Sequence, residues 1–301
     1  MVAISLGLGL AAGAPVTNSS IAVESAFLAT GSPNYEGGAD LTGLNFGAVG
    51  TLAIAPASAA KGSFESVIMF NLAGGVAQFN AEYGANHWII SGVTLDLASN
   101  YGVAGVQPNN PIFNVIAGGR FAIEWLSDSN WVEGTGTPNL PTTYGVCYDS
   151  LPTLLAPPCD ILCTNTYVPP GNNIRVPWSL PLSANLLGNL TNGGNVSFLF
   201  FAADNQVSYL FNSSIYGRGN EPYLNVVASP RLTILGGAIT NGAFQLNGLG
   251  GDSGFYNVQA ATNLATTHWV TIGTVTASSK GAIHYEDTNA IGPQRYYRLS
   301  Q

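Results

Sequence analysis

Acidic and aromatic side chains gather at one place in this sequence, where Glu124, Asp128 and Glu133 lie beside Trp125 and Trp131. Two carboxylates about 5 to 10 Å apart can hydrolyse a glycosidic bond, and carboxylate oxygens can also bind calcium. The cluster therefore fits a sugar subsite or a calcium site. It also fits a strand, a turn at 127–130 and a core tryptophan, which is the interpretation we favour.

A second segment whose residues could carry out chemistry is Gly251-Asp252-Ser253-Gly254. It resembles the sequence around the nucleophile of chymotrypsin-like serine proteases. That chemistry needs a histidine base held by a buried aspartate. None of His87, His268 and His284 has the surrounding sequence of that family. The segment is better interpreted as a turn between two strands, and no catalytic residue is expected.

The three cysteines, Cys147, Cys159 and Cys163, are candidates for a disulfide. Cys159 and Cys163 are spaced for a small disulfide loop, and Cys147 could pair with either of them. A zinc site is disfavoured because no histidine lies nearby, so a disulfide or free thiols are expected. Loops at Asp149 and Asp252 could hold structural calcium, but no EF-hand spacing of acids supports it. We therefore expect no metal and no cofactor.

Aromatic residues in loops could stack against sugar rings, although most of the 5 Trp, 13 Tyr and 13 Phe must be core residues. Loops rich in glycine, proline and asparagine are where exposed aromatic rings are expected. The candidate ligand-binding residues are Tyr35, Tyr101, Tyr144, Tyr148, Trp131 and Glu133.

Few residues of the chain are charged: 8 are Lys or Arg and 16 are Asp or Glu among 301, which gives a net charge of −8. About a quarter of the residues of an average soluble domain are charged. In this chain, glycine, proline and small polar residues, which form turns between strands, stand in place of the missing charged residues. No run of Lys or Arg could follow a nucleic acid backbone or an anionic membrane surface, so we expect no nucleic acid partner.

The N-terminal run from Met1 to Ala14 is apolar and ends in small residues, as the hydrophobic region of a signal peptide does. It is too short to cross a bilayer, which takes about 20 residues, so no membrane span is predicted. A buried N-terminal strand is the alternative. We assign residues 1–17 to a signal-peptide-like segment, which predicts a secreted protein that is extracellular or on the cell surface.

Short runs rich in β-branched and aromatic residues recur between glycine, proline, asparagine and serine. In one of them Phe121, Ile123 and Trp125 share one face, as in a strand with one face on a core. The strands predicted before residue 229 are Ala22–Ala29, Glu65–Leu72, Trp88–Leu97, Arg120–Leu126, Asn195–Ala202, Val207–Phe211 and Tyr223–Val227.

Helical patterns are scarce and short, and a domain boundary is predicted near Ser229. The sequence therefore predicts an all-β protein. Residues 18–228 would form an antiparallel, jelly-roll-like β-sandwich with a few short helices, and residues 229–301 a small C-terminal β-sandwich module. The predicted helices are Val76–Tyr83, Leu151–Ala156 and Ser183–Leu190. The strands predicted in the module are Leu232–Leu235, Phe244–Leu246, Tyr256–Ala260, Trp269–Val275, Ile283–Tyr285 and Tyr296–Leu299.

The segment from Ser25 to Ala228 resembles a DNRLRE-type domain of secreted bacterial and archaeal proteins. The motifs that carry the resemblance are TGSPNY at 30–35, SVIMFNL at 66–72, WVEGTG at 131–136 and SYLFNS at 208–213. The chain departs from the family at the central strand, where Met69 and Asn71 replace the usual Arg and Asp. Because Trp-x-Glu is part of the family pattern, Trp131 and Glu133 could serve only to orient a loop.

The C-terminal part is similar to a short β-module that often closes secreted proteins of planctomycete- and verrucomicrobium-like bacteria. The similarity rests on AATNL at 260–264, WVTI at 269–272 and PQRYYRL at 293–299. The two resemblances imply an exported protein with a surface-structural or carbohydrate-associated role and without catalysis.

Two functions remain open. In the first, the chain is a structural subunit of an extracellular sheath, fibre or matrix and associates with itself. The low charge favours this function, because close-packed protein surfaces tolerate few unpaired charges and neutral edge strands can pair between subunits. In the second, it is a carbohydrate-binding module that attaches to an extracellular polysaccharide.

Overall fold

The computed structural model describes residues 14–32, 38–57, 62–100, 118–168, 170–217, 219–251, 254–263, 268–279, 281–290 and 294–300. The chain divides into two compact units. We call residues 18–75 with 92–226 the larger unit, and residues 1–17, 76–91 and 227–301 the C-terminal unit.

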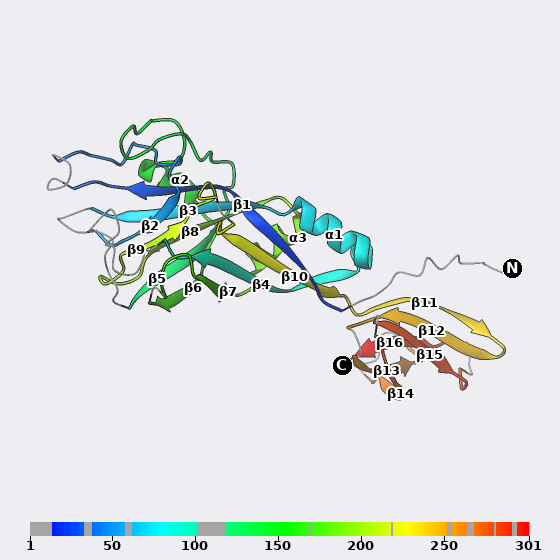
Figure 1. The fold of residues 1–301 in the computed structure, drawn as a ribbon. Helices are drawn as coiled ribbons and strands as arrows, with labels where there is room; N and C mark the ends of the chain where they lie inside the picture. The colour runs from blue at the N-terminus through cyan, green and yellow to red at the C-terminus, as the bar shows by residue number, and fades with distance from the viewer. Residues whose placement is uncertain are drawn as a thin grey trace. The chain divides into compact units, whose positions relative to one another are not determined.

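Antiparallel strands dominate both units, and the described helices are short (Figure 1). The predicted all-β class is therefore confirmed. The helices are α1 (Ala73–Tyr83), the 3₁₀ turn η2 (Tyr148–Ser150), α2 (Leu151–Leu154) and α3 (Ala184–Asn192). The strands of the first 230 residues are β1 (Val16–Ala29), β2 (Thr51–Ile54), β3 (Phe64–Asn71), β4 (Trp88–Ala98), β5 (Gly119–Leu126), β6 (Cys159–Tyr167), β7 (Arg175–Ser179), β8 (Asn195–Ala202), β9 (Tyr209–Asn212) and β10 (Tyr223–Pro230). They are followed by β11 (Thr233–Thr240), β12 (Ala243–Leu249), β13 (Phe255–Ala261), β14 (Val270–Thr276), β15 (Ala282–Asp287) and β16 (Tyr296–Ser300).

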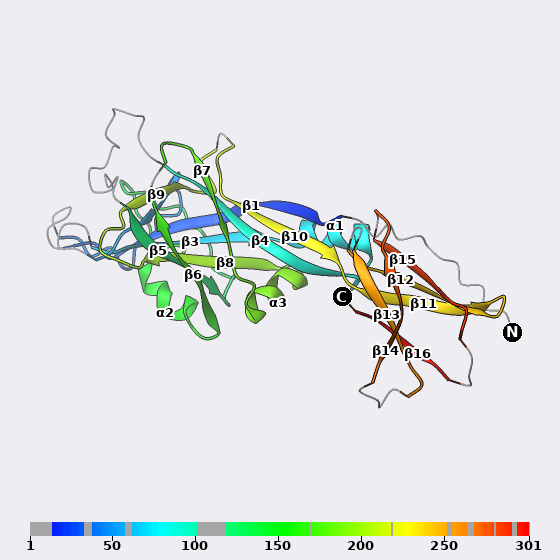
Figure 2. The same ribbon diagram turned by 90° about the horizontal axis from the view of Figure 1, so that it is seen from below.

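Eight strands form one sheet in the order β6-β5-β8-β3-β1-β10-β4-β7. The sheet is strongly curled (Figures 1 and 2), and aromatic side chains of its two edge strands, β6 and β7, are in contact. The rings of Tyr167 on β6 and Trp178 on β7 are 5.6 Å apart between centroids. Phe121 on β5 lies 5.5 Å from Trp178, and Phe211 on β9 joins the same group of rings. The curl therefore builds the sandwich and encloses an aromatic core.

The sheet is buried on both faces around β5, where the sequence pattern predicted one buried face. Phe121 faces the aromatic core, whereas Leu126 packs on the other side with Trp131, Leu151 and Leu154. That second layer is the segment 131–154, which includes α2 and lies over the sheet (Figure 1). Six of the eight residues of Gly119–Leu126 are buried, as expected of a strand covered on both faces.

Cys159 and Cys163, one of the candidate disulfide pairs, lie in a strand that holds them too far apart for a disulfide. Both residues belong to β6, four positions apart. At about 3.3 Å per residue their Cα atoms are about 13 Å apart, beyond the limit of about 7 Å for a disulfide. All three cysteines, Cys147 included, are free. Burial raises the pKa of the Cys159 and Cys163 thiols, so neither is a ready metal ligand or nucleophile.

The C-terminal unit contains two three-stranded sheets, ordered β11-β12-β15 and β14-β13-β16. Their core includes Leu246, Tyr256 and Ile283. The hairpin β11–β12 turns at Asn241 and Gly242, whose φ angles of 53° and 84° are both left-handed. Asn-Gly is the residue pair that such a two-residue hairpin turn prefers, so the sequence fixes this turn locally.

Candidate functional site

The candidate residue Glu133 is held in a network of hydrogen bonds in the larger unit. Its Oε1 accepts from the backbone N–H of Ser25 at 2.9 Å and from the hydroxyl of Ser214 at 2.6 Å. Its own N–H donates to Oε2 of Glu24 at 2.8 Å. The two carboxylates, Glu24 and Glu133, therefore join β1 to the loop after Trp131.

The carboxyl groups of Glu24 and Glu133 are partly buried hydrogen-bond acceptors. Burial raises the pKa of Glu24, the N–H of Glu133 opposes this shift, and the nearby Glu133 carboxylate adds to it. Both carboxyl groups accept from backbone N–H groups, which fixes them within the fold. The arrangement is well suited to fastening a loop to β1.

Asn45 fastens the same loop from the other side. Its Nδ2 donates to the carbonyls of Glu133 and Val146 at 2.6 and 2.7 Å, and its Oδ1 accepts from the N–H groups of Gly47 and Gly136 at 3.1 and 2.9 Å. The side chain is fully buried. All four hydrogen-bonding positions of the amide are therefore used inside the protein.

The two tryptophans of the predicted cluster are core residues. Trp131 is 9% exposed and its Nε1 donates to the hydroxyl of Ser197 at 3.0 Å. Trp125 is also buried, and its Nε1 donates to Oδ1 of Asn189 at 3.2 Å. Neither ring presents a face on which a sugar could stack. Asp128 accepts from the N–H of Asn130 at 2.9 Å, as a turn residue does.

The structure describes two of the four tyrosine candidates. Tyr35 and Tyr101 lie outside the described residues. Tyr144 is 63% exposed, whereas Tyr148 is half-buried and packs beside the core layer of Trp131. Of these two described candidates, Tyr144 has the ring that is open to a ligand.

A second acidic group, which the sequence did not suggest as a unit, surrounds Tyr148. The Tyr148 hydroxyl donates to Oε1 of Glu65 at 3.4 Å. Burial raises the pKa of Glu65 to about 7; the Tyr148 hydrogen bond opposes the shift and the nearby Glu124 carboxylate adds to it. Burial also raises the pKa of Glu124, and Asp160 contributes. A carboxyl group with a pKa near 7 is a frequent feature of active sites, but buried structural acids share it.

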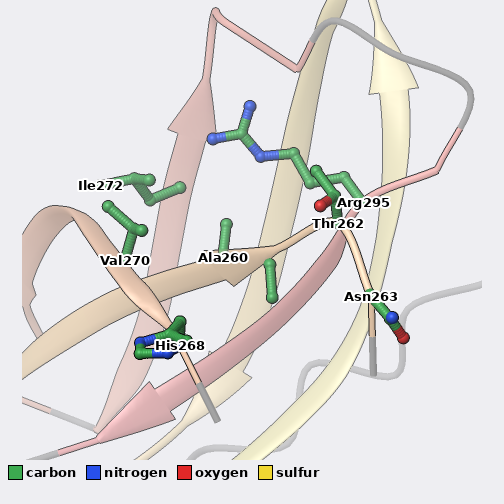
Figure 3. Close-up of a pocket in the computed structure, with 8 residues that line it drawn as sticks. Ala260, Thr262, Asn263, His268, Val270, Ile272 and Arg295 are labelled. Carbon is green, nitrogen blue, oxygen red and sulfur yellow. The ribbon is translucent and has the colours of Figure 1, made fainter. Parts of the chain in front are cut away.

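A hollow of about 590 Å³ lies in the C-terminal unit (Figure 3). Figure 3 shows Arg295 and His268 at opposite ends, with the apolar side chains of Ala260 and Val270 between them. Arg295 is already engaged, since Nη1 donates to the carbonyl of Asn289 at 2.6 Å and Nε lies 3.3 Å from Oδ2 of Asp287. The hollow therefore has an apolar floor, and its polar lining residues are Thr262, Asn263, His268 and the engaged Arg295.

The C-terminal unit also has two unusual sheet edges. Seven of the eight residues of β11 are exposed, and neither β11 nor β14 contains Lys, Arg, Asp, Glu or Pro. Natural proteins usually protect edge strands with charges, proline, bulges or a covering segment. Of these protections, β11 and β14 each have a bulge, at Leu235 and Ile272, but no charge and no proline. Within the described residues, no further strand pairs with the outer side of β11 or β14. These two strands could accept a strand from another chain.

Two other edge strands, β7 and β15, carry charges or proline. The edge strand β7 contains Arg175 and Pro177, and the edge strand β15 ends in Glu286 and Asp287. In contrast to these two strands, β11 and β14 have neither a charged residue nor a proline.

The described residues contain no group of three or more His, Cys, Asp or Glu placed to hold a metal ion. Ser253 and Asp252 lie outside them, and the flanking Gly254 donates its N–H to the carbonyl of Gly251 at 3.0 Å. Across the same described ranges, no helix is long and apolar enough to cross a membrane.

Comparisons with known proteins add little. No protein-family model matches the sequence, and no curated protein sequence is similar to it. Among solved structures, a β-glucuronidase of Lactobacillus rhamnosus aligns over 95% of this chain and 44% of its own, with 8% identity and a TM-score of 0.22. The chain thus spans less than half of that enzyme, and a likeness this weak carries no argument.

Proposed function

We propose that this chain is an extracellular, non-catalytic structural protein of a bacterium, which associates with copies of itself in a sheath, fibre or matrix. The observation that carries the proposal is the pair of exposed, uncharged edge strands β11 and β14. Each presents a row of backbone N–H and C=O groups to which another strand can bond.

The placement of the acids supports a structural role. Glu133 and Glu24, which a hydrolytic mechanism would need free, hold a loop through backbone hydrogen bonds. The two indole rings of that region are in the core. The resemblance of residues 25–228 to DNRLRE-type domains supports the same proposal, together with the signal-peptide-like N-terminus.

Sedimentation of the purified full chain tests the proposal, over about a hundredfold range of concentration because association depends on concentration. Electron microscopy and a glycan array complete the experiment. We expect the average mass to rise with concentration in the absence of sugar, with filaments, sheets or discrete oligomers in the images.

A chain that stays monomeric at every concentration would overturn the proposal. If that monomer also binds the glycan array, the chain is the polysaccharide-binding module of the second hypothesis, and Tyr144→Ala should then weaken binding. Hydrolysis of a polysaccharide that is lost in Glu133→Gln would overturn the non-catalytic part.

A further inference from the structure

We propose that β11 pairs antiparallel with β11 of a second copy of this chain, around a two-fold axis at Gly237. The inference rests on the proposed function, because it names the surface through which the chain associates with itself. Its partner is a second copy, and its contact is a continuous sheet across the two chains.

The sequence of β11 reads almost the same in both directions. Thr233–Thr240 is TILGGAIT, and in reverse it is TIAGGLIT, so only Leu235 and Ala238 exchange places. In a two-fold pair of identical strands each contact occurs twice, with the residues interchanged. The symmetric sequence therefore places Thr opposite Thr and Ile opposite Ile in both halves of the pair.

A β-bulge makes this register possible. In a regular strand, Ile234 and Ile239 would point to opposite faces, because they are five residues apart. In the hairpin, however, Ile234 lies opposite Gly248 and Ile239 opposite Phe244, with a register shift between them. Gly248 and Phe244 are four residues apart on the regular strand β12, so they share a face, and so do Ile234 and Ile239.

The bulged residue is Leu235, which has no partner of its own on β12. Without it, the strand runs Thr, Ile, Gly, Gly, Ala, Ile, Thr, which is symmetric around Gly237 except that Gly236 corresponds to Ala238. A two-fold axis at Gly237 then sets Ile234 of one chain opposite Ile239 of the other on the same face of the joint sheet. Sequence and bulge agree on one register.

The paired residues have surface to bury. Ile239 is 74% exposed and Ile234 is 37% exposed. Directly opposite side chains in an antiparallel pair have Cβ atoms about 4.5 to 5.5 Å apart. Each isoleucine of one chain would therefore cover an isoleucine of the other, and this would occur twice across the pair.

The distribution of charge favours contact between two copies of the chain at β11. The chain carries a net charge of −8, which opposes contact between copies over most of their surface. No residue from Thr233 to Thr240 is charged. The strand is a neutral stretch on which two acidic chains can meet without like charges facing each other.

Disulfide cross-linking tests the register. In the full chain with Cys147, Cys159 and Cys163 changed to serine, one preparation carries Ile234→Cys and another carries Ile239→Cys. Oxidation of the mixture should give dimers that contain one chain of each kind. Each preparation alone should stay unlinked, because in this register the two copies of either position lie about 13 Å apart along the strands.

Two outcomes of the cross-linking would overturn the proposal. Linking of Ile239→Cys chains to each other would show parallel, in-register pairing. Absence of mixed dimers, at concentrations where the unmodified chain associates, would show that β11 does not pair in this way.

A lysine substitution tests the surface without cysteine. Ile239→Lys places a charge opposite Ile234 of the partner, and we expect it to weaken dimer formation at least tenfold. The matched control is Phe255→Lys, at a residue 61% exposed on β13, the central strand of the other sheet. The control should dimerise as the unmodified chain does.

The lysine variants also separate this inference from the function on which it rests. If the unmodified chain associates and Ile239→Lys associates equally well, the β11 pair is wrong and the proposed function stands. If the unmodified chain is monomeric at every concentration, the proposed function fails and the pair fails with it.

Discussion

Asn45 illustrates how side chains of this protein that could do chemistry serve instead to hold loops. Its buried amide makes four hydrogen bonds, to the backbone groups of Gly47, Glu133, Gly136 and Val146. An amide that donates twice and accepts twice can replace the regular pairing of strands where two loops meet. The loop that carries Glu133 and Tyr144 depends on it.

Replacing Asn45 should therefore destabilise the larger unit. Asn45→Ala leaves two N–H groups and two carbonyls buried without partners, which we expect to lower the free energy of unfolding by about 2 to 4 kcal/mol. Asn45→Asp should be similarly harmful, because a carboxylate would face the carbonyls of Glu133 and Val146. Urea unfolding measures both.

The control for Asn45 is Asn139→Ala, at an exposed residue of the same loop, which should change the free energy of unfolding by less than about 0.5 kcal/mol. Equal stability of Asn45→Ala and Asn139→Ala would contradict the role given to the buried amide.

Glu65 should make stability depend on pH. Its pKa in the folded chain is about 7, against an ordinary value of 4.5. Between these values the folded chain holds a proton that the unfolded chain has lost, so the free energy of unfolding falls as the pH rises through this window. The fall should be about 1 to 2 kcal/mol, allowing for partial exposure of the carboxyl.

The variant Glu65→Gln isolates this effect, because its side chain is neutral at every pH and can still accept from Tyr148. It should equal the unmodified chain near pH 5 and exceed it in stability near pH 8. Urea unfolding at the two pH values makes the comparison. A parallel loss of stability in both proteins would assign the pH dependence to other groups.

At the scale of elements, the strands found from sequence are those whose pattern is local. Alternation and β-branched residues identified the runs that became β1, β3, β4, β5 and β8. The strands that were missed have weaker signals: β2 has four residues, β7 contains Pro177, and β6 mixes cysteine with polar residues. Such strands form because neighbouring strands pair with them, which no local pattern records.

The helix α3 follows from its own sequence, and two glycines in it should respond in opposite ways to alanine. Gly188 is exposed inside the helix, with open space where a Cβ would lie. Gly188→Ala should stabilise the larger unit by about 0.5 to 1 kcal/mol.

Gly193, by contrast, ends the helix with a left-handed φ of 72°. Gly193→Ala should destabilise by about 1 kcal/mol, because an L side chain is strained there. Thermal unfolding of the two variants checks the opposite signs. The same sign for both would mean that α3 does not control the stability of the unit.

At the scale of the whole molecule, composition was sufficient for the fold class and insufficient for the arrangement. Few charges and many turn residues favoured an all-β chain, and the structure is one. The strand order β6-β5-β8-β3-β1-β10-β4-β7 joins strands from distant parts of the sequence. Nothing local in β1 predicts that β10 will be its neighbour, and nothing in residues 76–91 predicts that they belong with residues 227–301.

The candidate site was predictable to the same limited degree. The sequence pointed to Trp131 and Glu133, but their partners Ser197, Ser25 and Glu24 come from other strands. The near-symmetric order of residues in β11 is visible in the amino-acid sequence alone. Its meaning depends on the bulge at Leu235 and on the exposed edge, which only the folded chain shows.

The neighbours of β1 set a constraint on when this protein can fold. Its partner β3 follows soon after it, but its other partner, β10, is separated from it by about two hundred residues of chain. As the chain leaves the ribosome, one side of β1 has no strand to pair with until residues 223–230 have been made. Sheets with such distant pairings fold slowly, so the order of synthesis favours a sheet that remains incomplete until β10 has been made.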